Sequence, residues 1–176
     1  MKVLPDSQAA GAPSTSRLYP ALETNLRLLE QAVALLGQLS QTQFVQSYRP
    51  AEGAIGAHLR HVIEFYQCFI TQWPEGKVRY DKRARSKEVE TDPAKALAAL
   101  REIHSSLLLV PPNLSLCITH FDGDCSNSDT TRELSYLADH ATHHYALIQL
   151  VAKLGGLRLE DGFGYAPSTL ANKAKN

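Results

Sequence analysis

The sequence predicts an all-α protein, a four-helix bundle with a small β-hairpin between its third and fourth helices. Two observations carry this prediction. Four long segments repeat apolar residues every three or four positions, and one short stretch alternates apolar and polar residues. The 176 residues suffice for one domain with a sizeable core, which we predict over residues 17–170, between tails at 1–16 and 171–176.

The first two predicted helices cover about residues 20–39 and 54–73, with a connector at 41–50 between them. Each has apolar residues at steps of three and four, as an amphipathic helix in a bundle requires. Gly53 and Gly56 are poor helix formers, and we expect them to admit a neighbouring backbone rather than to bind phosphate. The apolar stripes consist of Leu22, Leu26, Leu29, Val33 and Leu36 in the first helix and Ile55, Leu59, Val62, Ile63, Tyr66, Phe69, Ile70 and Trp73 in the second.

The third predicted helix starts after Asp92, a residue type that caps helix N-termini, and ends before Pro111. The fourth begins near Thr130, because Thr130 and Glu133 have the spacing of a capping box. It ends at about residue 154, where two glycines follow.

Residues 114–120, between the third and fourth helices, alternate apolar and polar side chains. An Asp-Gly-Asp turn follows at 122–124, and together these features predict the small hairpin. The turn lacks the twelve-residue spacing of a calcium-binding loop, so we do not expect calcium there.

The charge pattern favours neither a nucleic-acid nor a membrane partner. Lys plus Arg and Asp plus Glu both number 18, so no global field attracts either one. Basic residues gather at 76–90, but acidic residues interrupt them and there is no ladder of aromatic side chains, so we predict a solvated loop. No apolar run reaches the roughly 18 residues that a membrane span needs. Residues 1–16 lack the apolar centre of a secretory signal.

The three cysteines are Cys68, Cys117 and Cys125. They form no Cys-x-x-Cys pair and are odd in number, which is typical of proteins in a reducing compartment. We therefore expect a cytoplasmic protein with free thiols. A bridge between Cys117 and Cys125 is the less favoured alternative.

Two histidines stand out in the fourth predicted helix. His140 and His144 lie one turn apart, in the middle of a stripe that contains Leu137, Ala141 and Ile148. Burial of an imidazole without a partner costs about 1–3 kcal/mol, so the pair needs a physical reason. A divalent metal bound by both rings supplies one. Core histidines bonded to backbone or water are the alternative.

A catalytic metal site usually has three protein ligands, so we expect a third ligand from a facing helix. The second predicted helix offers His58 and His61. Its helical wheel slightly prefers His58, which falls closer to the centre of the apolar face, and leaves the choice open.

Three segments, residues 55–62, 132–148 and 163–170, resemble the DinB/YfiT-like metalloprotein superfamily, in particular a bacterial DinB-like branch. The resemblance covers roughly residues 20–170. It implies a four-helix bundle that holds a divalent metal through an H-x-x-x-H pair, here His140 and His144, and one histidine of the second helix, which matches His61. It departs at Glu64-Phe65, where some relatives have Asp-His. The candidates for supporting groups around the ligands are His58, His143 and Glu64. For the two histidines, a contact to substrate is a further alternative, and simple packing is the favoured interpretation.

A site of three neutral imidazoles leaves the charge of a divalent ion (Zn, Ni or Fe) uncompensated and favours an anionic ligand. The main reaction implied by the resemblance is transfer of a low-molecular-weight thiol, held as thiolate, to a small-molecule substrate. The alternatives are a hydrolase that uses metal-bound hydroxide and a non-catalytic metal-binding or structural bundle. The wide apolar stripes of the first two helices either complete the core or form a homodimer contact.

Overall fold

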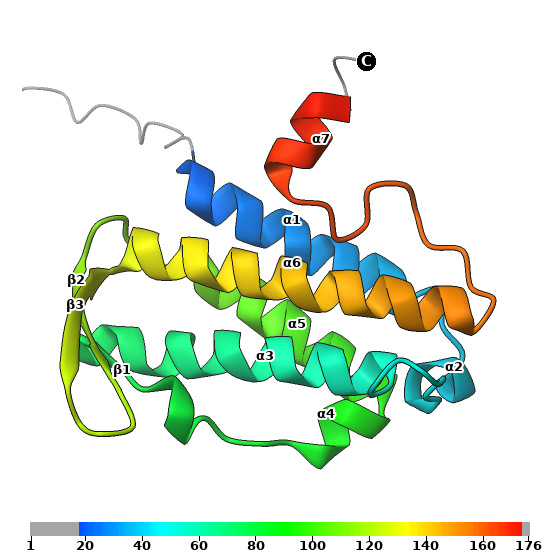
Figure 1. Cartoon of the computed structure of the whole chain (residues 1–176). Helices are drawn as coiled ribbons and strands as arrows, with labels where there is room; N and C mark the ends of the chain where they lie inside the picture. The colour runs from blue at the N-terminus through cyan, green and yellow to red at the C-terminus, as the bar shows by residue number, and fades with distance from the viewer. Residues whose placement is uncertain (1–17, 174–176) are drawn as a thin grey trace, which may run out of the picture.

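The computed structural model describes residues 18–173. Four long helices pack side by side (Figure 1): α1 (Pro20–Leu36), α3 (Ile55–Gln72), α5 (Pro93–Leu107) and α6 (Thr130–Leu154). Helix α1 packs against α5 and α6, and α3 packs against the same two helices. The predicted all-α four-helix bundle is therefore confirmed. The predicted tail at 1–16 lies outside the described residues, and the division of the chain into a domain and two tails stays a prediction.

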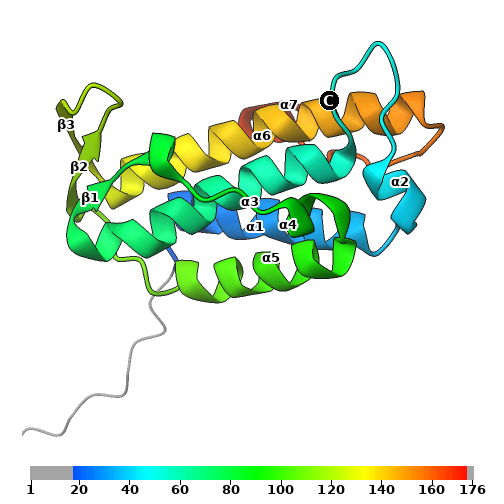
Figure 2. The same ribbon diagram turned by 90° about the horizontal axis from the view of Figure 1, so that it is seen from below.

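The direction of the helices explains the longest connection of the bundle. Figures 1 and 2 show that α3 and α5 run in the same direction, opposite to α1 and α6. Neighbouring helices that run in the same direction need a connection that returns along the whole bundle. Residues 73–92 supply it, and Figure 2 shows this crossover lying along α3. It contains η1 (Trp73–Glu75), β1 (Lys77–Val78), η2 (Tyr80–Lys82) and α4 (Lys87–Thr91).

The crossover replaces the solvated loop that the sequence predicted at 76–90. Val78 and Val89 are buried and attach it to the core. Glu64 of α3 accepts the backbone N–H of Ser86 at 2.9 Å and so fixes the middle of the segment. Charged residues dominate its composition, but these few buried contacts decide its path.

Buried polar groups connect three helices of the core. The Tyr66 hydroxyl donates to Oδ1 of Asn25 at 2.6 Å, and Nδ2 of Asn25 donates to the carbonyl oxygen of Leu134 at 2.8 Å. Asn25 is fully buried, and these bonds tie α1 to α3 and α6. The Tyr145 hydroxyl donates to the carbonyl oxygen of Leu28 at 2.8 Å, a second link between α6 and α1.

Helix α6 begins where the sequence predicted, but with another cap. The N-cap is Asp129, whose carboxylate accepts a backbone N–H of the first turn at 2.9 Å. The Thr130 hydroxyl donates instead to the carbonyl oxygen of Pro111, and the buried Glu133 carboxylate accepts the Tyr80 hydroxyl at 2.9 Å. The predicted capping box is wrong because both of its side chains serve tertiary contacts.

A short helix, α2 (Gln41–Val45), stands where the sequence predicted a connector. Ser40 and Gln43 form a capping box at its start, and Phe44 is buried. A Cβ atom on Gly56 would meet the Phe44 ring at 2.8 Å and would also run into the carbonyl oxygen of Glu90. The close backbone approach predicted at Gly56 is confirmed.

The predicted hairpin between the third and fourth long helices is confirmed. Strands β2 (Ser115–Thr119) and β3 (Cys125–Asp129) pair in antiparallel fashion, and β1 adds to β2 in parallel to give a sheet of order β1-β2-β3. The sequence did not predict β1 because two residues carry no readable alternation.

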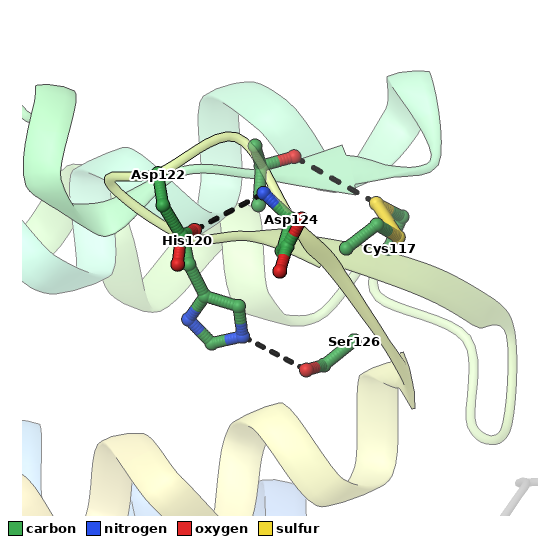
Figure 3. The surroundings of a disulfide bond; sticks show 7 residues. Cys117, His120, Asp122, Asp124 and Ser126 are labelled. Atoms are coloured by element: carbon green, nitrogen blue, oxygen red, sulfur yellow. Dashed lines mark hydrogen bonds between the residues drawn. A yellow bond between two sulfur atoms is a disulfide. The ribbon is translucent and has the colours of Figure 1, made fainter.

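A disulfide joins Cys117 and Cys125 across the hairpin, with a Cα–Cα distance of 5.6 Å (Figure 3). The expectation of three free thiols is therefore wrong. The register places Thr119 opposite Cys125, so Cys117 is its diagonal neighbour on the same face, within reach of a bridge. The pairing leaves Cys68 as a buried free cysteine. The cellular location of the protein stays a prediction.

The last described element is α7 (Pro167–Lys173), in place of part of the predicted closing loop and tail. Residues 171–173 therefore belong to a helix, and 174–176 lie outside the described residues. The preceding loop packs on the bundle through Phe163, whose ring stacks on Tyr145 at 4.9 Å between centroids. None of the helices in 18–173 combines the length and apolar character that a membrane crossing requires.

Candidate metal centre

Helices α3 and α6 bring three histidines together. One ring nitrogen each of His61, His140 and His144 lies within 4.8 Å of the other two. His140 and His144 are one turn apart on α6, with ring centroids 4.8 Å apart, and His61 faces them from α3 at 5.1 and 4.6 Å. All three histidines are half-buried.

The cluster contains His61, and His58 lies next to it, against His144. Nδ1 of His58 lies 3.3 Å from Nδ1 of His144, and Nε2 of His58 lies 3.0 Å from the carbonyl oxygen of Glu52. His58 therefore contacts the pair through His144, whereas His61 is the histidine of α3 whose ring nitrogen lies within 4.8 Å of both others. Which of the two is the third metal ligand stays a prediction. A wheel locates the centre of an apolar face but not the neighbouring helix toward which each side chain points.

The bonds of His58 determine the proton positions on two rings. A carbonyl oxygen only accepts, so Nε2 of His58 carries the proton that it donates to Glu52. Nδ1 of a neutral His58 then accepts from Nδ1–H of His144. This arrangement leaves the lone pair of His144 on Nε2. The described contacts thus prepare His144 as a ligand through a defined nitrogen.

The other two predicted supporting groups lie outside the cluster. His143 is exposed, and its ring meets that of His144 edge-on at 5.2 Å between centroids. Glu64 is 3% exposed, and its carboxylate lies 3.6 Å from the Arg60 guanidinium and 3.8 Å from that of Arg83. Glu64 therefore balances two arginines next to the cluster.

Burial holds the three clustered histidines in their neutral form. It is the largest cause that lowers the pKa of His61 to about 4, of His140 to about 4 and of His144 to about 3. The positive charge of Arg83 lowers the pKa of His61 and His140 further. Neutral imidazoles keep a free lone pair, so these rings are in the protonation state that metal binding needs.

The residues fit a divalent metal on a direct structural criterion. Nε2 of His140 is buried and has no hydrogen-bond partner among residues 18–173. Such an unpaired atom is costly unless something else satisfies it, and a metal ion would do so. Imidazole nitrogens suit Zn, Ni and Fe, and three protein ligands leave a coordination position open for another ligand.

Several residues around the cluster were missed by sequence reasoning. Phe65 stacks on the His140 ring at 4.1 Å between centroids, in a group with Tyr80 and Tyr136. The Arg83 guanidinium lies over the Phe65 ring at 4.6 Å, with Nη2 3.4 Å from Nδ1 of His61. Phe65 and Tyr136 follow the helical stripe of the ligands, a signal that could have identified them. Arg83 carried no such signal, because its place depends on the path of the crossover.

Comparison with known proteins supports the fold. No model of a known protein family matches the chain. A stretch of 107 residues is 34% identical to FK506-binding protein 5 of Rhizopus delemar; it covers 56% of this chain but only 28% of that protein. The structure of YfiT from Bacillus subtilis, described as a probable metal-dependent hydrolase with an unusual four-helix bundle topology, matches with a TM-score of 0.56 and 19% identity, over 84% of this chain and 95% of that one. This protein therefore has the YfiT-like four-helix-bundle fold.

Proposed function

We propose that this protein is a divalent-metal-dependent hydrolase of small ester or amide substrates, with the metal held by His61, His140 and His144. Two observations carry the proposal: one ring nitrogen from each of the three histidines converges on the same place, and Nε2 of His140 is buried with no hydrogen-bond partner among residues 18–173. The similarity to YfiT, itself described as a probable metal-dependent hydrolase, supports the same reaction class.

Each ligand has a defined role in the proposal. His140 offers an atom that no described residue satisfies, and His144 offers Nε2 because His58 holds its other nitrogen. His61 completes the trio from the facing helix. A bound ion would lower the pKa of water to about 7 and so supply a nucleophile at neutral pH.

A hollow near the histidines, though not lined by any of the three, provides a place for substrate. This hollow of about 400 Å³ lies between η2, the hairpin and the first turns of α6, and it is lined by Tyr80, Ile118, Phe121, Arg132 and Tyr136, among others. Tyr136 connects this hollow to the cluster, since its ring centroid is 6.0 Å from that of His140. The lining combines aromatic side chains with charged ones such as Asp81, Arg132 and Glu133, which suits the non-reacting part of a small polar organic molecule.

Thiolate transfer, the main reaction expected from the sequence, receives less support than hydrolysis. The match to a probable hydrolase favours water over a thiol as the nucleophile. Transfer of a low-molecular-weight thiol stays a prediction, as do the identity of the metal and a homodimer.

The test compares zinc-, nickel- and iron-loaded protein with chelator-stripped protein on a panel of ester and amide substrates, each with and without an added thiol. We expect metal-dependent turnover without thiol. His140→Ala should abolish it, and His104→Ala, a change of a histidine on α5 outside the cluster, should leave it intact. Turnover only with thiol would favour the transferase. Absence of turnover in all loaded samples would favour the non-catalytic bundle.

A further inference from the structure

Arg83 is a confined cation next to the three histidines. Its side chain is 15% exposed, and Nη1 donates to the carbonyl oxygen of Tyr80 at 3.2 Å. Nη2 lies 3.4 Å from Nδ1 of His61. Since a guanidinium only donates, His61 is the acceptor in this contact. The crossover thus carries a fixed positive charge to the edge of the cluster.

Binding of a metal to His61 necessarily changes this contact. A neutral imidazole has a single nitrogen lone pair. If the ion takes Nδ1, Arg83 loses its acceptor directly. If the ion takes Nε2, Nδ1 must carry the proton and again cannot accept. In both cases Nη2 of Arg83 loses the acceptor that it has among residues 18–173.

A second N–H donor of Arg83, Nε, already lacks a hydrogen-bond partner. Nε is buried and forms an ion pair with Oε2 of Glu64 at 3.8 Å, which is too long for a hydrogen bond, so neither atom has a hydrogen-bond partner in the described part of the chain. Nε and Nη2 form one edge of the guanidinium, the edge that binds a carboxylate with two parallel bonds. Arg79 uses the same two atoms on Asp81 in this structure, at 2.9 and 3.3 Å.

The charges around the site also call for an anion. Arg60 lies 3.3 Å from the carboxylate of Glu90 and 3.6 Å from that of Glu64. These two carboxylates together balance the two arginines, so the charge of a divalent ion on three neutral imidazoles would remain uncompensated.

We propose that Arg83 is a substrate-selecting residue, whose Nε and Nη2 bind the carboxylate of a substrate while its ester or amide group lies at the three-histidine metal site. The substrate class is then a small carboxylic acid with a hydrolysable bond nearby, such as an N-acyl amino acid. This inference rests on the proposed metal site and adds the part of the substrate that is recognised.

The test uses isothermal titration of the cobalt-loaded protein with N-acetylglycine and with its neutral amide. A charge-assisted pair predicts about a 10- to 100-fold preference for the acid. Arg83→Gln should abolish this preference. Arg83→Lys keeps the positive charge but lacks the two parallel N–H donors of the guanidinium, so it should retain only part of the preference. The matched control is Arg85→Gln, an exposed arginine two residues away, which should behave as the unaltered protein.

Metal affinity is measured in the same samples to separate the two hypotheses. We expect Arg83→Gln to hold cobalt at least as tightly as the unaltered chain, because a cation next to the site is removed. An equal preference for the acid in Arg83→Gln and the unaltered protein would overturn the inference and leave the metal site standing. Loss of cobalt in Arg83→Gln would assign Arg83 to the structure of the site instead. An unaltered chain that binds no metal would overturn both proposals.

Discussion

Nδ1 of His58 lies 3.3 Å from Nδ1 of His144, and this contact joins α3 and α6 next to the candidate metal centre. The carbonyl oxygen of Glu52 fixes the proton on the far nitrogen of His58. Through two hydrogen bonds, a backbone group therefore determines which nitrogen of His144 can bind a metal.

We predict that His58→Ala weakens metal binding by about 10- to 100-fold, the usual cost of losing such a support. Competition with a coloured chelator measures the affinity. His143→Ala is the matched control, because His143 is exposed and only touches the edge of His144, and its affinity should stay within a few-fold of the unaltered value. Equal affinities for the two variants would argue against the support.

The metal-free protein should lose stability as the pH falls from about 6.5 toward 4. Histidines in an unfolded chain titrate near 6.5, whereas burial lowers the pKa of His61 and His140 to about 4 and of His144 to about 3. Between these values the unfolded chain binds more protons, so the free energy of unfolding falls with falling pH. Urea unfolding at a series of pH values measures the slope, and His144→Ala should reduce it. A pH-independent stability over this interval would contradict the lowered pKa values.

Gly56→Ala should destabilise the protein by at least about 1–3 kcal/mol, because the added methyl group has to displace the Phe44 ring and the backbone at Glu90. Gly37→Ala is the matched control: Gly37 has a helical φ of −67°, and its added Cβ would find the carbonyl oxygen of Ala34 at an ordinary 3.4 Å. This control should be neutral or slightly stabilising. Denaturant midpoints of the two variants test the prediction, and a smaller loss for Gly56→Ala than for the control would contradict the close contact.

Tyr66→Phe should cost about 1–3 kcal/mol of stability, because Oδ1 of the fully buried Asn25 loses the hydroxyl that donates to it at 2.6 Å. Tyr136→Phe removes a hydroxyl from an exposed tyrosine and should stay within about 0.5 kcal/mol. Thermal unfolding of the two variants gives the comparison. Equal melting temperatures would show that the Asn25 bond contributes nothing.

The long helices could be predicted because their signal is local. The apolar stripe of α6 and the glycines after it set the extent of that helix, and the spacing of His140 and His144 placed both rings on one face. The N-cap of α6 could not be predicted, because Thr130 and Glu133 have the right spacing but bond to residues far away in the sequence.

The path of the crossover and the positions of its residues could not be predicted from the sequence for a similar reason. The path of residues 73–92 depends on the pairing of β1 with β2, where Lys77 and Val78 lie opposite Cys117 and Ile118. Nothing in the composition of a charged segment reveals that partner, and so Arg83 was expected in solvent. The disulfide was not favoured, because it depends on the hairpin register. The odd number of cysteines reflects only the average behaviour of proteins in reducing compartments.

The most direct test of the central claim is elemental analysis of the protein purified without a histidine tag and reconstituted with zinc. We expect about one equivalent of zinc per chain in the unaltered protein and none in the His140→Ala/His144→Ala double variant, with circular dichroism confirming that the variant is folded. Stoichiometric zinc in the folded double variant, or none in the reconstituted unaltered chain, would contradict the proposed site.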